Sequence, residues 1–333
     1  MNISKVCILG GTGFVGSTLV SKLAAEGIKT RLISRRPERH RDLLVLPNVE
    51  IVEADINDFN RLSYYLHDVD AVINLVGILN DNKLDGAGFR RIHVELPKMI
   101  VQACQKNNIS RLLHMSALQA DAGTSPSHYL RSKSEGENHL HIYSDKGLQI
   151  TTFRPSIIFG PGDDFFNRFA RLMKISPFII PVPRASSRFA PVYVGDVADS
   201  IVKHLQDPES NGLRVDLCGP REYSMMELMK FTADTIGIKR EFIALPDRLS
   251  QVMAHVSDIA NSIPLISPSM NMLIPGMKEA RFSVDNYRSL LIDSVCDDAE
   301  KQLTSIEDIV PRYLGTSTSQ NNFDRFRVQA KRK

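Results

Sequence analysis

Seven residues near the start of the chain have the types and spacing of a loop that cradles phosphate groups. In order they are Gly10, Gly11, Thr12, Gly13, Phe14, Val15 and Gly16. The run follows an apolar segment and opens an amphipathic one, so its glycines can turn the chain, bring backbone close to a pyrophosphate and let the next helix pack tightly. The first N–H groups of that helix then face the phosphates. We therefore predict a dinucleotide site with contacts from Gly10, Thr12, Gly13, Phe14, Val15 and Gly16.

Three polar residues at the end of the second apolar run bear on which dinucleotide is bound. Ser34, Arg35 and Arg36 stand where a loop that prefers NAD usually offers a carboxylate to the adenosine ribose. Guanidinium groups bind phosphate through a planar fork, so this pair favours the 2′-phosphate of NADP(H). The alternative is a solvated basic turn before Pro37, in which case NAD(H) is also possible.

Two further segments are expected to line the same ligand. Asp55 and Ile56 follow the third apolar run, where an acidic side chain can meet adenine. Leu75, Val76 and Gly77 end the fourth run, and a small residue there lets the ligand lie close to the strand. The carboxyl ends of parallel strands meet at one edge of a sheet, so both segments should converge on the glycine loop.

A tyrosine and a lysine supply candidate acid–base chemistry. Tyr129 and Lys133 are four residues apart, a spacing that puts both side chains on one face of a helix. None of the other seven tyrosines has a lysine four residues later. A nearby ammonium group is expected to lower the pKa of the phenol, which could then exchange a proton with a carbonyl or alcohol while hydride moves at nicotinamide.

Short apolar runs with helix-period segments between them position these residues. The runs cover residues 6–9, 30–33, 49–52, 71–76, 111–115 and 149–153. Helices are expected over residues 14–26, 59–66, 89–106 and 129–143. Alternation of this kind predicts the α/β class: a Rossmann-type doubly wound parallel sheet with a smaller C-terminal α/β subdomain on the substrate side.

The pattern loosens after residue 155, where prolines and glycines interrupt it. We expect an NADP(H)-binding domain over 1–155 that returns at about 190–206, an interleaved substrate-side subdomain over 156–315, and a flexible basic tail over 316–333. The return to the sheet is assigned to the apolar run 191–194, followed by a helix that Asp196 caps. Four arginines in the subdomain are either binding groups for an anion or solvated charges: Arg168, Arg171, Arg184 and Arg188.

The segment 245–275 is rich in Met, Ile, Leu, Ser and Pro. Its first half has the apolar spacing of an amphipathic helix, at Leu249, Val252, Met253, Val256 and Ile259. Packing of this stripe against its own domain is the favoured interpretation. A lid over a pocket, a docking site for a partner, and a helix lying on a membrane surface are the alternatives.

Several runs of the sequence resemble extended or atypical short-chain dehydrogenase/reductases of the NAD-dependent epimerase/dehydratase type. They are GGTGFVG, YLRSK and RPSIIFGPGD. The longer run RPSIIFGPGDDFFNRFA, with PVYVGDVA after it, is similar in particular to the NADPH-binding accessory subunit of respiratory complex I and its bacterial relatives. The resemblance spans about residues 3–315. It implies that Tyr129 and Lys133 contact the cofactor, and that the nicotinamide end is lined by Pro155, Ser156, Ile157 and Ile158.

Two positions depart from the family pattern. Extended members carry Ser or Thr just after the fifth strand to polarise a substrate carbonyl. Aligned on the strand, Ala117 holds that place and Ser116 comes one residue early, whereas the thirteen residues to Tyr129 assign the role to Ser116. The helix asparagine common in the superfamily is replaced by His93.

Two classes of function follow. The first is a binding protein that holds NADP(H) as an accessory subunit or assembly factor of a respiratory complex. The second is an NADP-dependent oxidoreductase or epimerase that acts on a carbonyl or alcohol, such as a quinone-pathway intermediate or a sugar nucleotide. In the second class Tyr129, Lys133 and Ser116 are the catalytic residues.

Charge and composition exclude other classes. The 333 residues carry a net charge of +3, but the last thirteen hold five basic residues against one acidic residue, so the rest sums to about −1. A nucleic-acid-binding surface on the folded body is therefore not expected. The basic end is either a solvated terminus or a contact for an acidic partner or membrane surface.

The cysteines and the apolar segments bear on location. Cys7, Cys104, Cys218 and Cys296 are scattered without metal-site spacing, so we predict reduced packing residues and no metal. The first apolar run begins too early to leave room for a signal or transit peptide, and no uncharged apolar stretch reaches the ~18 residues of a spanning helix. We expect a cytoplasmic protein, with peripheral attachment at the inner membrane as an option.

Overall fold

The computed structural model describes residues 3–81, 85–144, 146–175, 178–262, 282–296, 300–301 and 304–315. The chain divides into two units by its internal contacts. The first unit comprises Met1–Ser156, Val194–Cys218 and Cys296–Lys301, and the second comprises Ile157–Tyr193, Gly219–Val295 and Gln302–Lys333.

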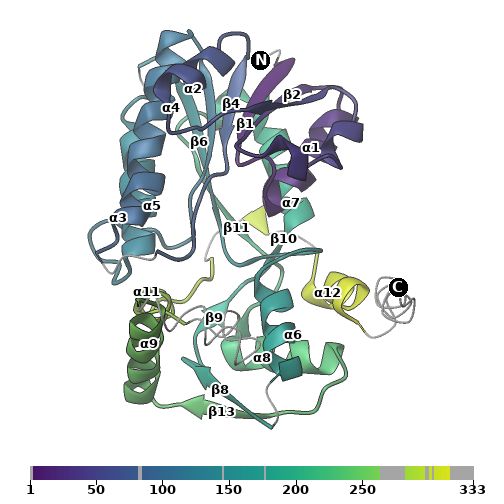
Figure 1. Ribbon diagram of the computed structural model, residues 1–333, viewed down its shortest axis with the longest axis vertical. Coiled ribbons are helices and arrows are strands. Elements are labelled where there is room, and N and C mark those ends of the chain that lie inside the picture. Colours follow the sequence, from purple (N-terminus) through teal and green to yellow (C-terminus); the bar gives the residue numbers. More distant parts are fainter. Residues whose placement is uncertain are drawn as a thin grey trace, which may run out of the picture. The chain divides into compact units, whose positions relative to one another are not determined.

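An eight-stranded sheet forms the centre of the first unit (Figure 1). Its order is β14-β11-β6-β5-β4-β1-β2-β3, and every neighbouring pair is parallel. The strands are β1 (Lys5–Leu9), β2 (Lys29–Ser34), β3 (Val49–Glu53), β4 (Ala71–Asn74), β5 (Arg111–Met115), β6 (Gln149–Pro155), β11 (Arg214–Cys218) and β14 (Glu300–Lys301). The predicted doubly wound sheet is confirmed. The strand order reverses between β1 and β4, which is where such sheets bind ligands.

Helices cover both faces of this sheet (Figure 1). On one face lie α1 (Phe14–Ala25) and α7 (Val194–Leu205). On the other lie α2 (Phe59–Tyr65), α4 (Leu96–Lys106) and α5 (His128–His141). The predicted helix 89–106 is interrupted: α3 (Ala87–Arg90) passes through a π-helical turn, Arg91–Glu95, before α4 begins. Every residue of β4 and β5 is buried, as expected for strands covered on both faces.

A buried arginine ties the sheet to α7. Arg111 on β5 is fully buried, and its guanidinium donates to the carbonyls of His204 and Leu205 at the end of α7. It also donates to the hydroxyls of Thr151 and Ser210, 2.9 and 2.7 Å away. Burial lowers the pKa of Arg111 to about 10. The arginine therefore serves as a cap for the last turn of α7, whose carbonyls have no partner within the helix.

Among its described residues, the second unit combines three two-stranded sheets with helices (Figure 1). The pairs are β7 (Ile158–Phe159) with β10 (Val192–Tyr193), β9 (Arg188–Phe189) with β12 (Tyr223–Ser224), and β8 (Ile179–Pro183) with β13 (Glu241–Leu245). The helices are α6 (Phe165–Ile175), α8 (Met225–Thr235), α9 (Asp247–Ser262), α11 (Val284–Ser289) and α12 (Ile306–Leu314). Apolar side chains of α6, α8 and α12 form its core with Phe159 and Ile180.

The predicted return to the sheet at 191–194 is wrong. The apolar residues there form β10, which pairs with β7 in the second unit. The chain rejoins the large sheet through β11 and β14 instead. Strand β11 has a mixed polar sequence because it lies near the sheet edge, so it gave no apolar signal. Helix α7 begins at Val194, so Asp196 lies in its first turn and is not its N-cap.

The predicted amphipathic helix near residue 249 is α9, but its apolar stripe does not pack inward. Leu249, Val252 and Val256 are exposed. The buried face holds Ala254 and Asp258 instead, and the Asp258 carboxylate accepts a hydrogen bond from the backbone N–H of Val284. The side of α9 that carries Asp258 therefore docks on α11, and the favoured packing prediction is wrong for these three exposed residues, whereas Met253 of the stripe is half-buried. Residues 263–275 and the predicted tail, 316–333, lie outside the described residues.

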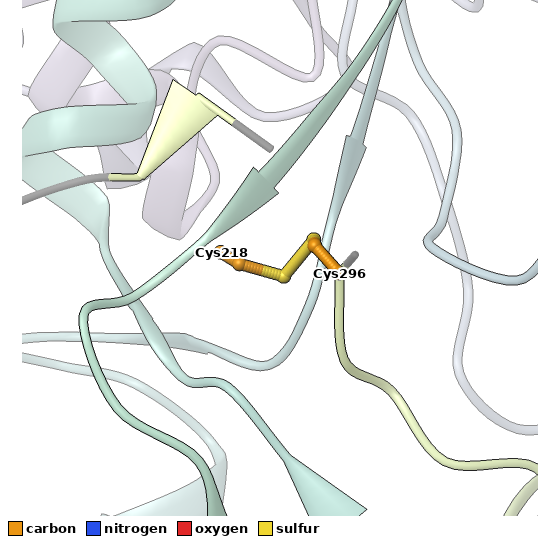
Figure 2. The surroundings of a disulfide bond; sticks show 2 residues. All are labelled: Cys218 and Cys296. Atoms are coloured by element: carbon orange, nitrogen blue, oxygen red, sulfur yellow. A yellow bond between two sulfur atoms is a disulfide. The ribbon is translucent and has the colours of Figure 1, made fainter. Parts of the chain in front are cut away.

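Two of the cysteines are joined. Figure 2 shows the disulfide between Cys218, the last residue of β11, and Cys296, which precedes β14. The bond holds these two neighbouring strand ends together across 78 residues of sequence. The prediction of reduced thiols is wrong here, because pairing depends on tertiary proximity that such a separation does not reveal. Cys7 and Cys104 are buried free thiols, as predicted.

Across the described residues, no helix combines the length and apolar character that crossing a bilayer requires.

Candidate dinucleotide site of the first unit

The glycine loop joins β1 to α1 with almost no space between its backbone segments. Gly10 has a φ of +79°, a conformation that favours glycine, and its carbonyl accepts the N–H of Gly13 at 3.0 Å. A Cβ placed on Gly16 would lie 2.5 Å from the Gly10 carbonyl oxygen and from the Gly11 backbone. Only glycine fits there, so the start of α1 lies directly against the loop, as the sequence predicts for a phosphate cradle.

The amino end of α1 is open to an anion. Its N-cap is Gly13, which makes no side-chain cap, and its first turn carries no acidic residue. The loop's N–H groups and the helix dipole therefore keep their attraction for a negative group. Gly13 is exposed, and Thr12, Phe14 and Val15 are half-buried around it. These features fit a pyrophosphate.

The ends of β2 and β3 border a hollow of about 380 Å³. Its lining comprises Arg35, Glu53, Ala54, Asp55, Asp58 and Arg61. Asn57 donates its backbone and side-chain N–H groups to Asp55, which lowers the pKa of that carboxyl. Ser34 lies beside Glu53 in the β2–β3 register, and its hydroxyl accepts the N–H of Arg36. Ile56 packs into the apolar core of the unit. The structure thus brings Arg35 and Asp55 together and adds Arg61, which the sequence analysis missed.

The end of β4 passes close to both the loop and α5. The backbone of Leu75 and Val76 would lie 3.1 Å from a Cβ on Gly10. A Cβ on Gly77 would lie 3.2 Å from the Lys133 ammonium nitrogen. Gly77 itself is exposed, so the ends of β1 and β4 and the Lys133 side chain meet around an accessible glycine.

Burial displaces the pKa values of the tyrosine and the lysine on α5 in opposite directions. Desolvation raises the pKa of Tyr129 to about 12. It lowers the pKa of Lys133 to about 8, an effect that Glu137 partly offsets. The Lys133 ammonium donates to the carbonyl of Met115 at 2.9 Å. The expectation of a lowered pKa for Tyr129 is therefore wrong, because desolvation of the buried phenolate raises it. A protonated phenol can still donate to a carbonyl.

Ser116 follows β5 directly and supplies a buried hydroxyl. Its Oγ has no hydrogen-bond partner among the described residues, although the side chain is only 3% exposed. Buried polar atoms normally have partners, so an orphan hydroxyl at a strand end fits a contact with a ligand. Ala117 has no group that could replace it.

His93 links three parts of the site through a chain of hydrogen bonds. Its Nε2 accepts the backbone N–H of Ile78 at 3.1 Å, and its Nδ1 lies 2.9 Å from the Ser132 hydroxyl. That hydroxyl donates to the carbonyl of Tyr129 at 2.8 Å. Since an N–H can only donate, Nε2 is unprotonated and Nδ1 carries the hydrogen. Burial, together with the Lys133 charge, lowers the pKa of His93 to about 2. His93 is therefore a neutral connector.

The π-helical turn places His93 against α5. A Cβ on Gly136 would lie 1.8 Å from the His93 carbonyl oxygen, so glycine is required for the two elements to approach. The ring of His93 stacks on Phe89 and meets the edge of the Tyr129 ring, with centroids 5.5 Å apart for the second pair. An inserted turn of this kind is frequent at functional sites. The sequence showed the residue change but not this role.

An ion cluster holds α5 on the sheet. Glu137 is fully buried and accepts from Arg154 of β6 at 3.0 Å. Its Oε1 also lies 2.6 Å from Nε of Arg214 on β11. The Glu137 carboxylate thus ties α5, the helix that carries Tyr129 and Lys133, to two strands. Removal of either arginine partner would leave part of a buried negative charge without compensation, which is costly.

The predicted nicotinamide-end residues fall in different units. Pro155 ends β6, and the Ser156 N–H donates to the Leu217 carbonyl at 3.0 Å within the first unit. Ile157 and Ile158 belong to the second unit, where the Ile157 carbonyl accepts the N–H of Val192 at 2.9 Å, so the role of these four residues at the nicotinamide end stays a prediction. The second unit's arginines are engaged with carboxylates in three cases: Arg168 with Asp164, Arg184 with Asp247 and Arg188 with Glu222. Within the described chain no cluster suited to a metal occurs.

Comparison with known proteins decides the family. The model of the NAD dependent epimerase/dehydratase family matches residues 6–217. The chain belongs to this family. The match covers the part of the chain from β1 to β11, which supplies every strand of the large sheet except β14, so the predicted resemblance is confirmed and a nicotinamide dinucleotide is the family's cofactor class.

Named relatives include both a respiratory subunit and an enzyme. The chain is 28% identical over 313 residues to the mitochondrial NADH dehydrogenase (ubiquinone) 1 alpha subcomplex subunit 9 of Arabidopsis thaliana, covering 92% of this chain and 74% of that protein. It is 30% identical over 245 residues to the ceramide reductase of Caulobacter vibrioides, covering 73% and 74%. The fold of DesIV from Streptomyces venezuelae, a dTDP-glucose 4,6-dehydratase with NAD bound, matches with a TM-score of 0.62 at 18% identity, over 73% of this chain and 85% of that one.

Proposed function

We propose that the chain binds NADP(H) along the carboxyl edge of its parallel sheet and serves as an accessory subunit or assembly factor of a respiratory complex. The observation that carries the binding claim is the glycine cradle. A Cβ on Gly16 would collide with the Gly10 backbone, and the N-terminus of α1 has no capping side chain. The accessory role is supported by the likeness to the plant respiratory subunit over 92% of the chain.

The assignment of residues in this proposal follows the strand ends. Gly10, Gly13 and Gly16 would hold the pyrophosphate, and Arg35 with Asp55 would meet the adenosine end. Lys133 would reach the nicotinamide ribose from beside Gly77. The NADP(H) preference rests on Arg35 and Arg36, although the hollow also carries the carboxylates of three acidic residues: Glu53, Asp55 and Asp58.

Fluorescence titration tests the 2′-phosphate contact. Wild-type protein and an Arg35→Ala/Arg36→Ala variant are titrated with NADPH and with NADH. Loss of two guanidinium–phosphate contacts should weaken NADPH binding about tenfold or more and leave NADH binding nearly unchanged. An Arg39→Ala variant is the matched control, because that arginine lies three residues on in an exposed turn. If the variant loses the same affinity for NADPH and for NADH, the proposed preference for NADP(H) is wrong.

A second candidate function is reduction of a carbonyl, and one observation favours it. The unpartnered hydroxyl of Ser116 lies at the end of the strand whose Met115 carbonyl binds Lys133. When bound, a reduced nicotinamide supplies hydride; Ser116 would then donate a hydrogen bond to the carbonyl oxygen of the substrate. Tyr129, whose raised pKa keeps the phenol protonated well above neutral pH, would deliver the proton. A quinone-pathway intermediate and a sugar nucleotide are the substrate classes to assay, with epimerase activity on the latter.

Location is part of the proposal. We place the protein in the cytoplasm, peripheral at the inner membrane. The disulfide between Cys218 and Cys296 is the one observation that disagrees with this location, because disulfides are rare in a reducing compartment such as the cytoplasm. Counting free thiols in denatured protein prepared from the cytosol with rapid alkylation tests this point. Four thiols indicate a reducing location, whereas two indicate that the bond forms in the cell.

A further inference from the structure

A small parallel sheet in the second unit presents an uncovered apolar face. In the β8–β13 pair, Ile180 and Val182 point into the core and are about 1% exposed. The alternate residues face outward: Ile179 and Ile243 are 53% and 50% exposed, and Pro181 lies between them as the partner of Ile243. Parallel sheets are usually covered on both faces, so a bare aliphatic face on one is unusual.

An aromatic side chain extends this face. Phe178 comes just before β8 and is 77% exposed, and its carbonyl accepts the N–H of Glu241 at the start of β13. We call Phe178, Ile179, Pro181 and Ile243 the apolar face. A second exposed row, Leu249, Val252 and Val256, begins on α9 four residues after β13 ends. Single exposed apolar residues are ordinary, whereas a contiguous group marks a contact surface.

Basic side chains border the apolar face. Arg240, next to the first residue of β13, donates from Nε to the carbonyl of Met173 near the end of α6 at 3.1 Å. That bond brings it beside Lys174, and Lys239 precedes it; both lysines are exposed. Glu241 is the acidic residue on the face itself. Asp247, which follows β13, is engaged with Arg184 at 2.9 Å. The border therefore carries a positive balance.

We propose that the apolar face and its basic border dock on the surface of an anionic lipid bilayer. Aliphatic and aromatic side chains would enter the headgroup region while the lysines attract acidic headgroups, the pattern of a protein that lies on a membrane. The inference rests on the proposed peripheral location and assigns it a surface; it concerns only second-unit residues and is independent of the proposed nucleotide site.

Vesicle flotation with the purified full-length chain tests the proposal. The protein is mixed with phosphatidylcholine vesicles, or with vesicles holding 30 mol% phosphatidylglycerol. We expect binding to the anionic vesicles that weakens with added salt. A Lys174→Gln/Lys239→Gln variant should bind about 25-fold more weakly, from roughly fivefold per basic residue removed. A Phe178→Ser/Ile243→Ser variant should lose binding to a similar extent.

Matched controls separate this surface from the rest of the molecule. Val45→Ser changes an 82% exposed apolar residue of the first unit and should leave vesicle binding unchanged. NADPH titration of each variant shows whether the fold and the nucleotide site are intact. Absence of binding to anionic vesicles would overturn the proposal. So would binding that survives both the lysine variant and the Phe178→Ser/Ile243→Ser variant but is lost on deletion of residues 321–333. A dimer in solution that the Phe178→Ser/Ile243→Ser variant dissociates would also overturn it.

Discussion

The candidate site has a phosphate end, around the glycine loop, and a chemistry end, around Tyr129 and Lys133. The two ends depend on different kinds of group. At the phosphate end the important groups are backbone: Gly10 has a positive φ, and a side chain on Gly16 would collide with the backbone of the loop. At the chemistry end they are buried side chains, and burial raises the pKa of Tyr129 while it lowers the pKa of Lys133. The close packing of the glycine loop tolerates substitutions elsewhere in the unit. The displaced pKa values of Tyr129 and Lys133, by contrast, depend on every residue packed around those side chains. Binding and turnover should therefore be separable by mutation.

The largest expected effect is confined to turnover. Tyr129→Phe removes the proton donor and should lower any NADPH-dependent carbonyl reduction by roughly 10²–10⁴-fold. The NADPH dissociation constant should change by less than about threefold, since the glycine cradle is untouched. Rates and titrations on the same preparation check this, with Tyr64→Phe as the control at an exposed tyrosine. Unchanged reduction by the variant would remove Tyr129 from the chemistry and favour the accessory role.

His93 joins the segment after β4 to the helix that carries Tyr129 and Lys133, so its loss should affect both cofactor binding and turnover. His93→Ala breaks the bonds to Ile78 and Ser132 and should weaken NADPH binding about tenfold, the effect of roughly 1.4 kcal/mol. His93→Gln keeps an acceptor and a donor and should recover most of that loss. Nitrogen-15 NMR should show the Nδ1–H tautomer from pH 5 to 8. A ring that titrates in this range would contradict the connector role.

The smallest effect is a pH dependence at the chemistry end. Because the pKa of Lys133 is lowered to about 8, its ammonium is present below that pH and is lost above it. NADPH binding that uses this charge should weaken about fivefold between pH 7 and pH 9. An ordinary lysine would give no change over this range. Lys133→Gln should bind weakly with a flat profile, and a wild-type profile that is equally flat would show that the ammonium does not contact the cofactor.

The phosphate end could be predicted from the sequence because its requirements are local. A glycine loop, the strand before it and the helix after it are adjacent in the chain, so Gly10–Gly16 and α1 were predictable. Tyr129 and Lys133 were found for the same reason, since helical spacing is local. The sign of the Tyr129 pKa change was not, because desolvation depends on Phe89, His93 and other residues that fold around the ring.

Long-range features were hidden from the sequence. The disulfide joins Cys218 to Cys296 across 78 residues, and β11 gave no apolar run because it lies near the sheet edge. The stripe on α9 has amphipathic spacing, but spacing alone does not say which face a helix buries. There the side that carries Asp258 docks on α11, which leaves Leu249 and Val256 exposed.

NADPH titration of a Gly16→Val variant tests the central claim most directly. A side chain at this position would collide with the Gly10 and Gly11 backbone, displacing α1 from the loop. Wild-type protein and a Gly123→Ala control, changed at an exposed loop glycine, should bind NADPH, and Gly16→Val should bind at least ~100-fold more weakly while circular dichroism shows a folded protein. A folded Gly16→Val protein that binds NADPH as tightly as wild type would contradict the account.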